Sequence, residues 1–122
     1  MLKYAAAAAA LAAVIGLPAA PTQELSCLHG PSETAAQKTR RQAALDFAHL
    51  VNTTESTAHK QAQAYYSLSD LHTIPAVPEG FKALLSSDGV SYTFSVKDTL
   101  DPCHFAFFSD QEGVVYSATP IR

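Results

Sequence analysis

The feature that most constrains the fold is a long stretch, residues 33–66, that contains neither proline nor glycine. Its apolar and small residues recur at steps of three, four and seven, which predicts one stripe along a single helix. The largest side chains of that stripe, the expected core anchors, are Phe47, Leu50 and Val51. Glu55 is expected to face water. Because so thin a stripe cannot stabilise an isolated helix, the remainder of the chain must supply a surface for it.

The ends of this helix carry recognisable signals. Ser32 stands where an N-cap hydroxyl is expected, and the helix is predicted to end near Tyr66. Residues 67–71 are predicted to add one short turn. Residues 72–80 contain two prolines and a glycine, so they are predicted to form a loop that crosses from the helix to a sheet.

From residue 81 onward the apolar period changes from 3.6 to two, which is typical of strands with one wet face. The predicted strands are residues 81–85, 90–97, 103–109 and 114–119. The second is the clearest, because Val90, Tyr92 and Phe94 fall on one face and serine, threonine and lysine on the other. The short connections require antiparallel neighbours, since a parallel return needs a crossover of about a dozen residues or more.

Helix and strands together predict the fold class. We expect an α+β domain in which one long N-terminal helix packs on a three- to four-stranded antiparallel meander. The helix would cover the large side chains of the sheet. The core anchors expected from the sheet are Tyr92, Phe94, Phe105 and Phe107.

The N-terminus has the pattern of a targeting segment. Lys3 precedes an apolar run over residues 4–17, and small residues follow, which is typical of a secretory signal peptide over residues 1–19. The apolar run is short for a membrane span of ~20 residues, although an uncleaved anchor is the alternative. We therefore expect a linker at 20–31, a single domain at 32–122, and an exported protein in the periplasm or outside the cell.

The two cysteines, Cys27 and Cys103, lie far apart in the sequence and have no metal-ligand spacing. In an exported chain they most simply form one disulfide, which would add ~4 kcal/mol in the chain-entropy model. Two buried free thiols are the alternative. The formal net charge of -3, without a basic stripe, argues against a nucleic-acid partner.

Two stretches resemble a known bacterial family. The helix carries Asn52-Thr53-Thr54-Glu55 ahead of aromatic residues, and the tail reads FAFFSDQEGVVYSATPIR. These are similar to the heads of type IV pilins and type II secretion pseudopilins, over about residues 39–122. The resemblance implies a head domain that joins a cell-envelope assembly. The prepilin N-terminal motif is absent from the sequence, so we expect a pilin-like head that is exported by an ordinary signal.

The sequence offers few groups for chemistry. His49 and His59 lie on nearly the same helix face but about 15 Å apart, so they cannot share a metal. Four acidic residues in predicted turns allow two interpretations: hydrogen bonds to their own backbone, or a calcium site of the kind the pseudopilin resemblance implies. These four are Asp98, Asp101, Asp110 and Glu112. No nucleophile elbow or other catalytic signature is present in the sequence.

These observations predict a function class rather than an activity. We expect a non-enzymatic structural or interaction module whose partners are other proteins, reached through the helical stripe or an edge of the meander. The alternative is a small periplasmic ligand-binding or inhibitor domain, and an uncharacterised hydrolase is the least favoured. We expect no cofactor beyond the calcium alternative, and contact with a membrane only if the N-terminal segment is retained.

Overall fold

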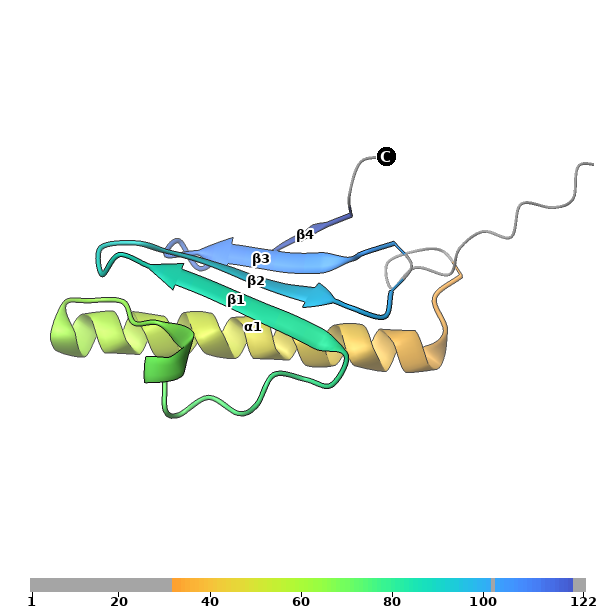
Figure 1. The fold of residues 1–122 in the computed structure, drawn as a ribbon, viewed down its shortest axis with the longest axis horizontal. Coiled ribbons are helices and arrows are strands. Elements are labelled where there is room, and N and C mark those ends of the chain that lie inside the picture. The colour runs from red at the N-terminus through yellow and green to blue at the C-terminus, as the bar shows by residue number, and fades with distance from the viewer. Residues whose placement is uncertain (1–31, 102, 120–122) are drawn as a thin grey trace, which may run out of the picture.

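The computed structural model describes residues 32–101 and 103–119, which form one helix laid along one face of an antiparallel sheet (Figure 1). The elements are α1 (Ala35–Ala62), the 3-10 turn η1 (Leu68–Asp70), β1 (Phe81–Ser87), β2 (Tyr92–Asp98), β3 (Ala106–Asp110) and β4 (Tyr116–Ala118). The sheet is a four-stranded meander in the order β1-β2-β3-β4. The predicted α+β class is thus confirmed. The helix is the first described element, but it is not at the N-terminus of the chain, because residues 1–31 precede it.

The start of α1 is set by a capping box. The Thr34 hydroxyl accepts the backbone N–H of Gln37 at 3.2 Å, and the Gln37 side chain accepts the backbone N–H of Thr34 at 2.8 Å. The predicted cap at Ser32 is therefore wrong, because only Thr34 has a Gln three residues later within reach. The helix ends earlier than predicted, at Ala62, and is capped by Gln63, whose φ of 58° is left-handed and whose N–H donates to His59 O.

The buried face of α1 is turned by roughly 70° around the helix from the predicted stripe, so that Phe47 and Val51 belong to both. Its members are Ala44, Phe47, Ala48, Val51, Asn52 and Glu55. Leu50 was expected to anchor the core but is 38 % exposed, whereas Glu55, expected in water, is fully buried. The two alanines let the helix approach the sheet closely. Asn52 and Glu55 are tolerated there because both find hydrogen-bond partners.

The sheet covers that face with aromatic side chains. All four of the expected sheet anchors are at most 5 % exposed: Tyr92, Phe94, Phe105 and Phe107. The ring of Phe94 lies 6.1 Å from that of Phe47, between centroids, and the ring of Tyr92 lies 5.0 Å from that of Tyr65. The core is therefore a layer of rings between α1 and the two central strands.

The strand boundaries differ from the prediction mainly at the turns. Val90 was assigned to the buried face of the second strand but is 82 % exposed, because it lies in the β1–β2 turn. Asp88 closes this turn by accepting the backbone N–H groups of Ser91 and Val90 at 2.7 Å and 2.9 Å, which lowers the pKa of its carboxyl. Gly89 supplies the left-handed backbone, with a φ of +87°.

Candidate functional site

The face of the sheet turned away from α1 is the most distinctive surface of the described residues, and we call it the open face. Side chains alternate along each strand, so one set on every strand points outward. The open face consists of Lys82, Leu84, Ser86, Thr93, Ser95, Lys97, Ala106, Phe108, Asp110, Tyr116 and Ala118. No described element packs over these side chains (Figure 1).

The strand register arranges the open face in rows. Leu84 pairs with Ser95, Ser95 with Phe108, and Phe108 with Tyr116, so these four form one row that crosses all four strands. Three members are large and apolar, and their exposed fractions are 61 % for Leu84, 42 % for Phe108 and 48 % for Tyr116. The rings of Phe108 and Tyr116 stack with centroids 5.5 Å apart. We call this set the apolar row.

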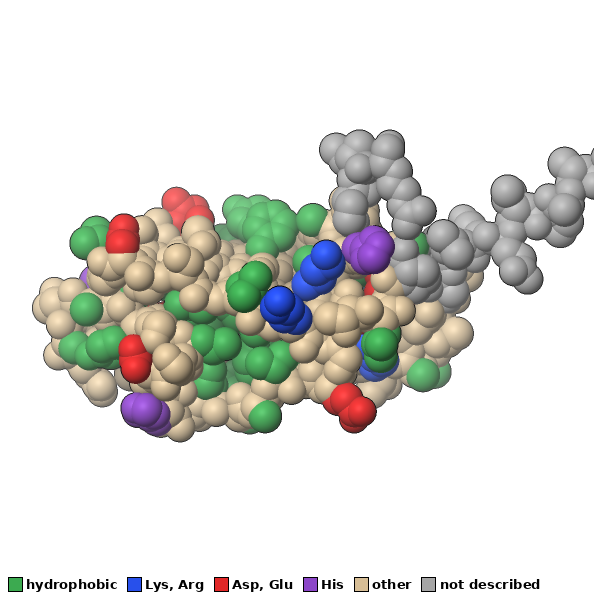
Figure 2. Space-filling model, in the orientation of Figure 1, with side chains coloured by type: hydrophobic (Ala, Val, Ile, Leu, Met, Phe, Trp, Pro, Cys, Tyr) green, Lys and Arg blue, Asp and Glu red, His purple; other side chains and the backbone are tan. Residues whose placement is uncertain are grey.

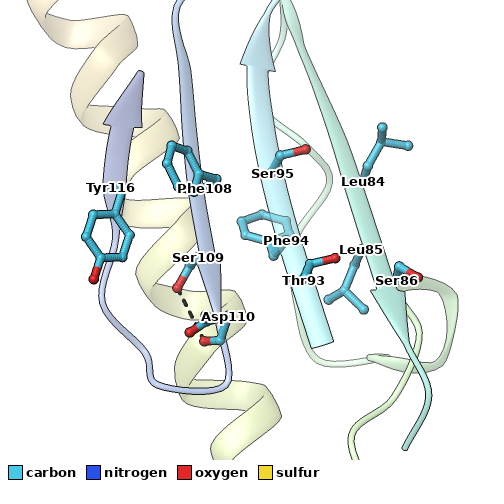
Figure 3. A pocket seen from close by; sticks show the side chains of 10 residues that line it. All are labelled: Leu84, Leu85, Ser86, Thr93, Phe94, Ser95, Phe108, Ser109, Asp110 and Tyr116. Carbon is cyan, nitrogen blue, oxygen red and sulfur yellow. Dashed lines mark hydrogen bonds between the residues drawn. The ribbon is translucent and has the colours of Figure 1, made fainter. Parts of the chain in front are cut away.

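A groove of about 570 Å³ interrupts the apolar row at Ser95 and extends towards Thr93. Its floor is β2 because Ser95 and Thr93 are short, and its walls are Leu84 of β1 and Phe108 of β3 (Figure 3). The carboxylate of Asp110 lines one end. The groove thus combines an apolar wall on each side with a hydroxyl-lined floor and a single charged group.

Charged side chains flank the apolar row, with opposite signs at its two sides. Lys82 and Lys97 pair across β1 and β2 on one side, and Asp110 pairs with Thr93 on the other. Figure 2 shows two basic side chains beside each other over the strands, with acidic side chains towards the left end of the view and another at the lower right. The open face is therefore basic, then apolar, then acidic along the strand direction.

Buried hydrogen bonds beneath the open face hold the sheet to α1. Asn52 donates from Nδ2 to the Ser109 hydroxyl at 2.8 Å and accepts the Tyr92 hydroxyl at Oδ1, at 2.7 Å. The Ser109 hydroxyl donates in turn to Val114 O at 2.8 Å. Burial raises the pKa of Tyr92, with a smaller contribution from the charge of Glu55. This network fixes β2 and β3 over the helix, and so positions the floor of the groove and its Phe108 wall.

Glu55 is a buried carboxyl at the same helix–sheet boundary. Its Oε2 accepts the backbone N–H of Tyr66 at 2.9 Å, and its Oε1 has no hydrogen-bond partner among the described residues. Burial raises the pKa of this carboxyl, and the hydrogen bond from Tyr66 opposes that rise in part. Glu55 therefore ties the chain after the helix back onto α1 and does not reach the open face.

The four acidic candidates for calcium fall into two separate pairs. Asp98 and Asp101 lie at the β2–β3 connection, whereas Asp110 and Glu112 lie at the opposite ends of the strands. One ion cannot bind all four, because the antiparallel register separates the pairs by about 13 Å or more. Both pairs form the expected turn hydrogen bonds, since Asp98 accepts the N–H of Leu100 at 2.8 Å and Asp110 that of Glu112 at 2.9 Å.

Asp98 has a further partner that the sequence did not reveal. It is fully buried, and its Oδ1 accepts a 2.9 Å hydrogen bond from Arg40 Nη2 of the helix. The second oxygen of Asp98 and one oxygen of Asp101 have no hydrogen-bond partner in residues 32–101 and 103–119. No group of three or more His, Cys, Asp or Glu side chains with metal-binding geometry occurs in that part of the chain.

Other predictions fall partly outside the described residues. Cys27 lies outside them, so its disulfide with Cys103 stays a prediction, as do the signal peptide over 1–19 and the linker over 20–31. His49 is exposed, and His59 stacks on the ring of Tyr65 with centroids 4.4 Å apart. These two histidines therefore lie in separate surroundings.

Sequence reasoning missed the apolar row as a candidate site. Alternation did place Phe108 opposite Phe105 and Phe107, so a large aromatic on a wet strand face was a usable signal. Leu84 and Tyr116 carried no such signal, because their alignment with Phe108 depends on the register of strands distant in sequence. The groove of the open face brings together hydroxyls, apolar walls and one carboxylate.

Comparisons with protein-family models, with curated proteins and with solved structures gave no match. Within the described residues, no helix has both the length and the apolar character needed to cross a membrane.

Proposed function

We propose that the protein is an exported, non-enzymatic structural or interaction module with a pilin-like head, and that it works by binding other proteins of a cell-envelope assembly. One observation carries the proposal: Leu84, Phe108 and Tyr116 lie exposed in a single row on an open sheet face. The rings of Phe108 and Tyr116 stack on each other, and exposed apolar side chains that are in contact, rather than scattered, are typical of interaction surfaces. Aromatic rings are also enriched at the centres of protein interfaces.

The arrangement of the core supports this role. The helix buries the other face of the sheet through rings and a hydrogen-bonded network, so the core of the domain lies on the side away from the open face. The strands beneath it are held by Asn52 and by the pair of Arg40 with Asp98, which makes the row a rigid platform. Rigid platforms lose little conformational entropy when they bind. Because fold class alone does not imply function, the argument rests on this surface.

Site-directed photocrosslinking in the cells that make the protein tests the proposal. A photoreactive residue replaces Phe108 on the open face or, as a matched control, Gln61 on the exposed side of α1. We expect protein adducts from position 108 and few from position 61. Equal adduct yields from both positions, or none from position 108, would refute the proposed role of the open face.

A second candidate function has its own supporting observation. The groove of about 570 Å³ falls within the range of ~300–1,000 Å³ that is usual for small-molecule sites. A small periplasmic ligand-binding or inhibitor domain would use this groove directly. It predicts that small amphiphilic compounds raise the melting temperature of the purified protein, and that Ser95→Phe, which fills the groove floor, abolishes that rise. The interaction module predicts no such shift.

Export is tested separately by the intact mass of the protein from cells, measured with and without reductant. We expect a chain that starts at Ala20 and is about 2 Da lighter before reduction, because Cys27 and Cys103 would each have lost a hydrogen. A mass that retains Met1, recovered with membranes, would instead support the uncleaved anchor.

A further inference from the structure

Two lysines of the open face are placed directly opposite each other. Lys82 and Lys97 are registered across β1 and β2, and both are exposed. Like charges in this position are destabilising. In the described part of the chain the ion pairs join Arg40 to Asp98 and Arg41 to Glu33, so neither lysine has a carboxylate partner there. An anionic group from another molecule would relieve this repulsion.

The same face carries anionic groups at its other end. Asp110 pairs with Thr93, four residues along β2 from Lys97, and so lies about 13 Å from the lysines. Asp88 and Glu112 are exposed in the two turns at that end. The apolar row lies between the basic and the acidic ends. Two copies that face each other with their strands running in opposite directions therefore have complementary open faces.

We infer that the open face binds the open face of a second copy of this chain, about a two-fold axis parallel to the apolar row. The inference rests on the proposed function, in that the open face is the interaction surface. Rotation about this axis lays row on row and places the lysines of each copy over the acidic end of the other. A two-fold axis along the strands would instead set lysines against lysines, so the charges select the first arrangement.

The groove gives this arrangement its fit. It runs from the apolar row towards the acidic end, with Thr93 and Ser95 in its floor and Asp110 at its side. The reversed pairing brings Lys97 of each copy over Thr93 of the other. The four methylenes of Lys97 then lie between Ser86 and Asp110, which flank Thr93 in the register, and the ammonium meets Asp110. By symmetry this contact is made twice.

The size of the open face predicts weak pairing. Its strands cover an area about 15 Å by about 20 Å, or roughly 300 Å² per copy, against ~800 Å² for a standard interface. We expect a dissociation constant on the order of 0.1–1 mM at low salt. Such an affinity is effective when copies are held near one another in an assembly, because a high local concentration replaces intrinsic strength.

Sedimentation velocity of the exported protein at up to about 1 mM, with charge-reversal variants, tests the inference. Lys97→Glu and Asp110→Lys should each weaken self-association about tenfold. Each substitution turns both symmetry-related contacts between positions 97 and 110 into contacts between like charges. An equimolar mixture of the two should associate as tightly as wild type, since both contacts are then restored. Lys60→Glu, on the exposed side of α1, is the matched control and should leave self-association unchanged.

Asp110→Lys also removes a turn hydrogen bond to Glu112 N–H, so a second variant covers the case in which it does not fold. Thr93→Lys places the same charge on the groove floor without touching the turn, and Lys97→Glu should rescue it in the same way. A monomeric wild type at about 1 mM, or mixtures no tighter than the single variants, would overturn the inference. In that case, photocrosslinks from position 108 to other proteins would still support the proposed function. If the protein neither self-associates nor forms photocrosslinks from position 108, both the inference and the proposed function are refuted.

Discussion

Removing the Asn52 side chain should destabilise the domain because it leaves a buried hydroxyl group without a hydrogen-bond partner. In Asn52→Ala the Tyr92 hydroxyl, in a residue only 3 % exposed, loses its 2.7 Å acceptor. An orphaned buried hydroxyl costs about 1–3 kcal/mol. The Ser109 hydroxyl loses the donor of Asn52 but still donates to Val114 O at 2.8 Å, so the loss of that second hydrogen bond adds little. We expect Asn52→Ala to lower the free energy of unfolding by about 2–3 kcal/mol.

A double-mutant cycle isolates this effect. Tyr92→Phe removes the donor and should cost about 1–2 kcal/mol, since it leaves the amide oxygen of Asn52 unpaired. The double variant leaves neither group behind, so its cost should fall below the sum of the single costs by about 1–2 kcal/mol. Thr53→Ala, on the exposed side of the same turn of helix, is the control and should stay within about 0.5 kcal/mol of wild type.

Urea unfolding provides the measurement, with the redox state of the cysteines held constant. The midpoints should shift while the denaturant slope stays unchanged, because the variants alter stability and not the surface exposed on unfolding. Single costs that add within about 0.3 kcal/mol would show that Asn52 and Tyr92 do not interact, and would refute the hydrogen-bonded attachment of sheet to helix.

Three further predictions address the helix. Phe47→Ala should cost ~3–5 kcal/mol by urea unfolding, because the ring is buried, whereas Lys60→Ala should stay within roughly 0.5 kcal/mol; equal small effects would mean that α1 is not docked in this way. Arg40→Ala should cost about 1–3 kcal/mol by the same assay, because buried Asp98 loses its cation, and a neutral result would contradict that pairing. For Glu55 the folded pKa is raised, so the folded state keeps its proton longer and stability falls as pH rises from about 4 towards the folded pKa. Unfolding of Glu55→Gln at several pH values should lack this fall, and parallel pH profiles would refute the buried carboxyl.

The general plan of the fold could be predicted from the sequence because its signals are local. The period of apolar residues distinguishes the helix from the strands, and the short connections make the sheet antiparallel. The pair Asp88 and Gly89 indicates a tight turn by residue type alone. Each of these inferences uses residues that lie within a few positions of one another.

The face of the helix could not be predicted, because it depends on partners far along the chain. Asn52 and Glu55 look like surface residues until Ser109, Tyr92 and the backbone of Tyr66 are brought to them by the fold. Leu50 looks like a core residue for the converse reason, since apolar character does not require burial. The spacing of apolar residues cannot indicate a polar residue that is buried because of its tertiary hydrogen bonds.

The candidate site escaped prediction for a related reason. Alternation separates Phe108 from the expected anchors Phe105 and Phe107, but a single exposed aromatic is unremarkable. Its importance comes from register, which aligns it with Leu84 on one side and Tyr116 on the other. Register in turn depends on where each strand begins, and β3 begins at Ala106 rather than at Cys103 as predicted.

Radical footprinting of the protein inside the cells that export it tests the central claim, that the open face is the contact surface. Oxidation of Phe108 and Tyr116 is compared with oxidation of Tyr66, which is similarly exposed at 37 % but lies in the segment between α1 and η1. We predict that the first two are protected in cells relative to dilute purified protein, while Tyr66 reacts equally in both. Equal oxidation of Phe108 and Tyr116 in the two settings would contradict the account.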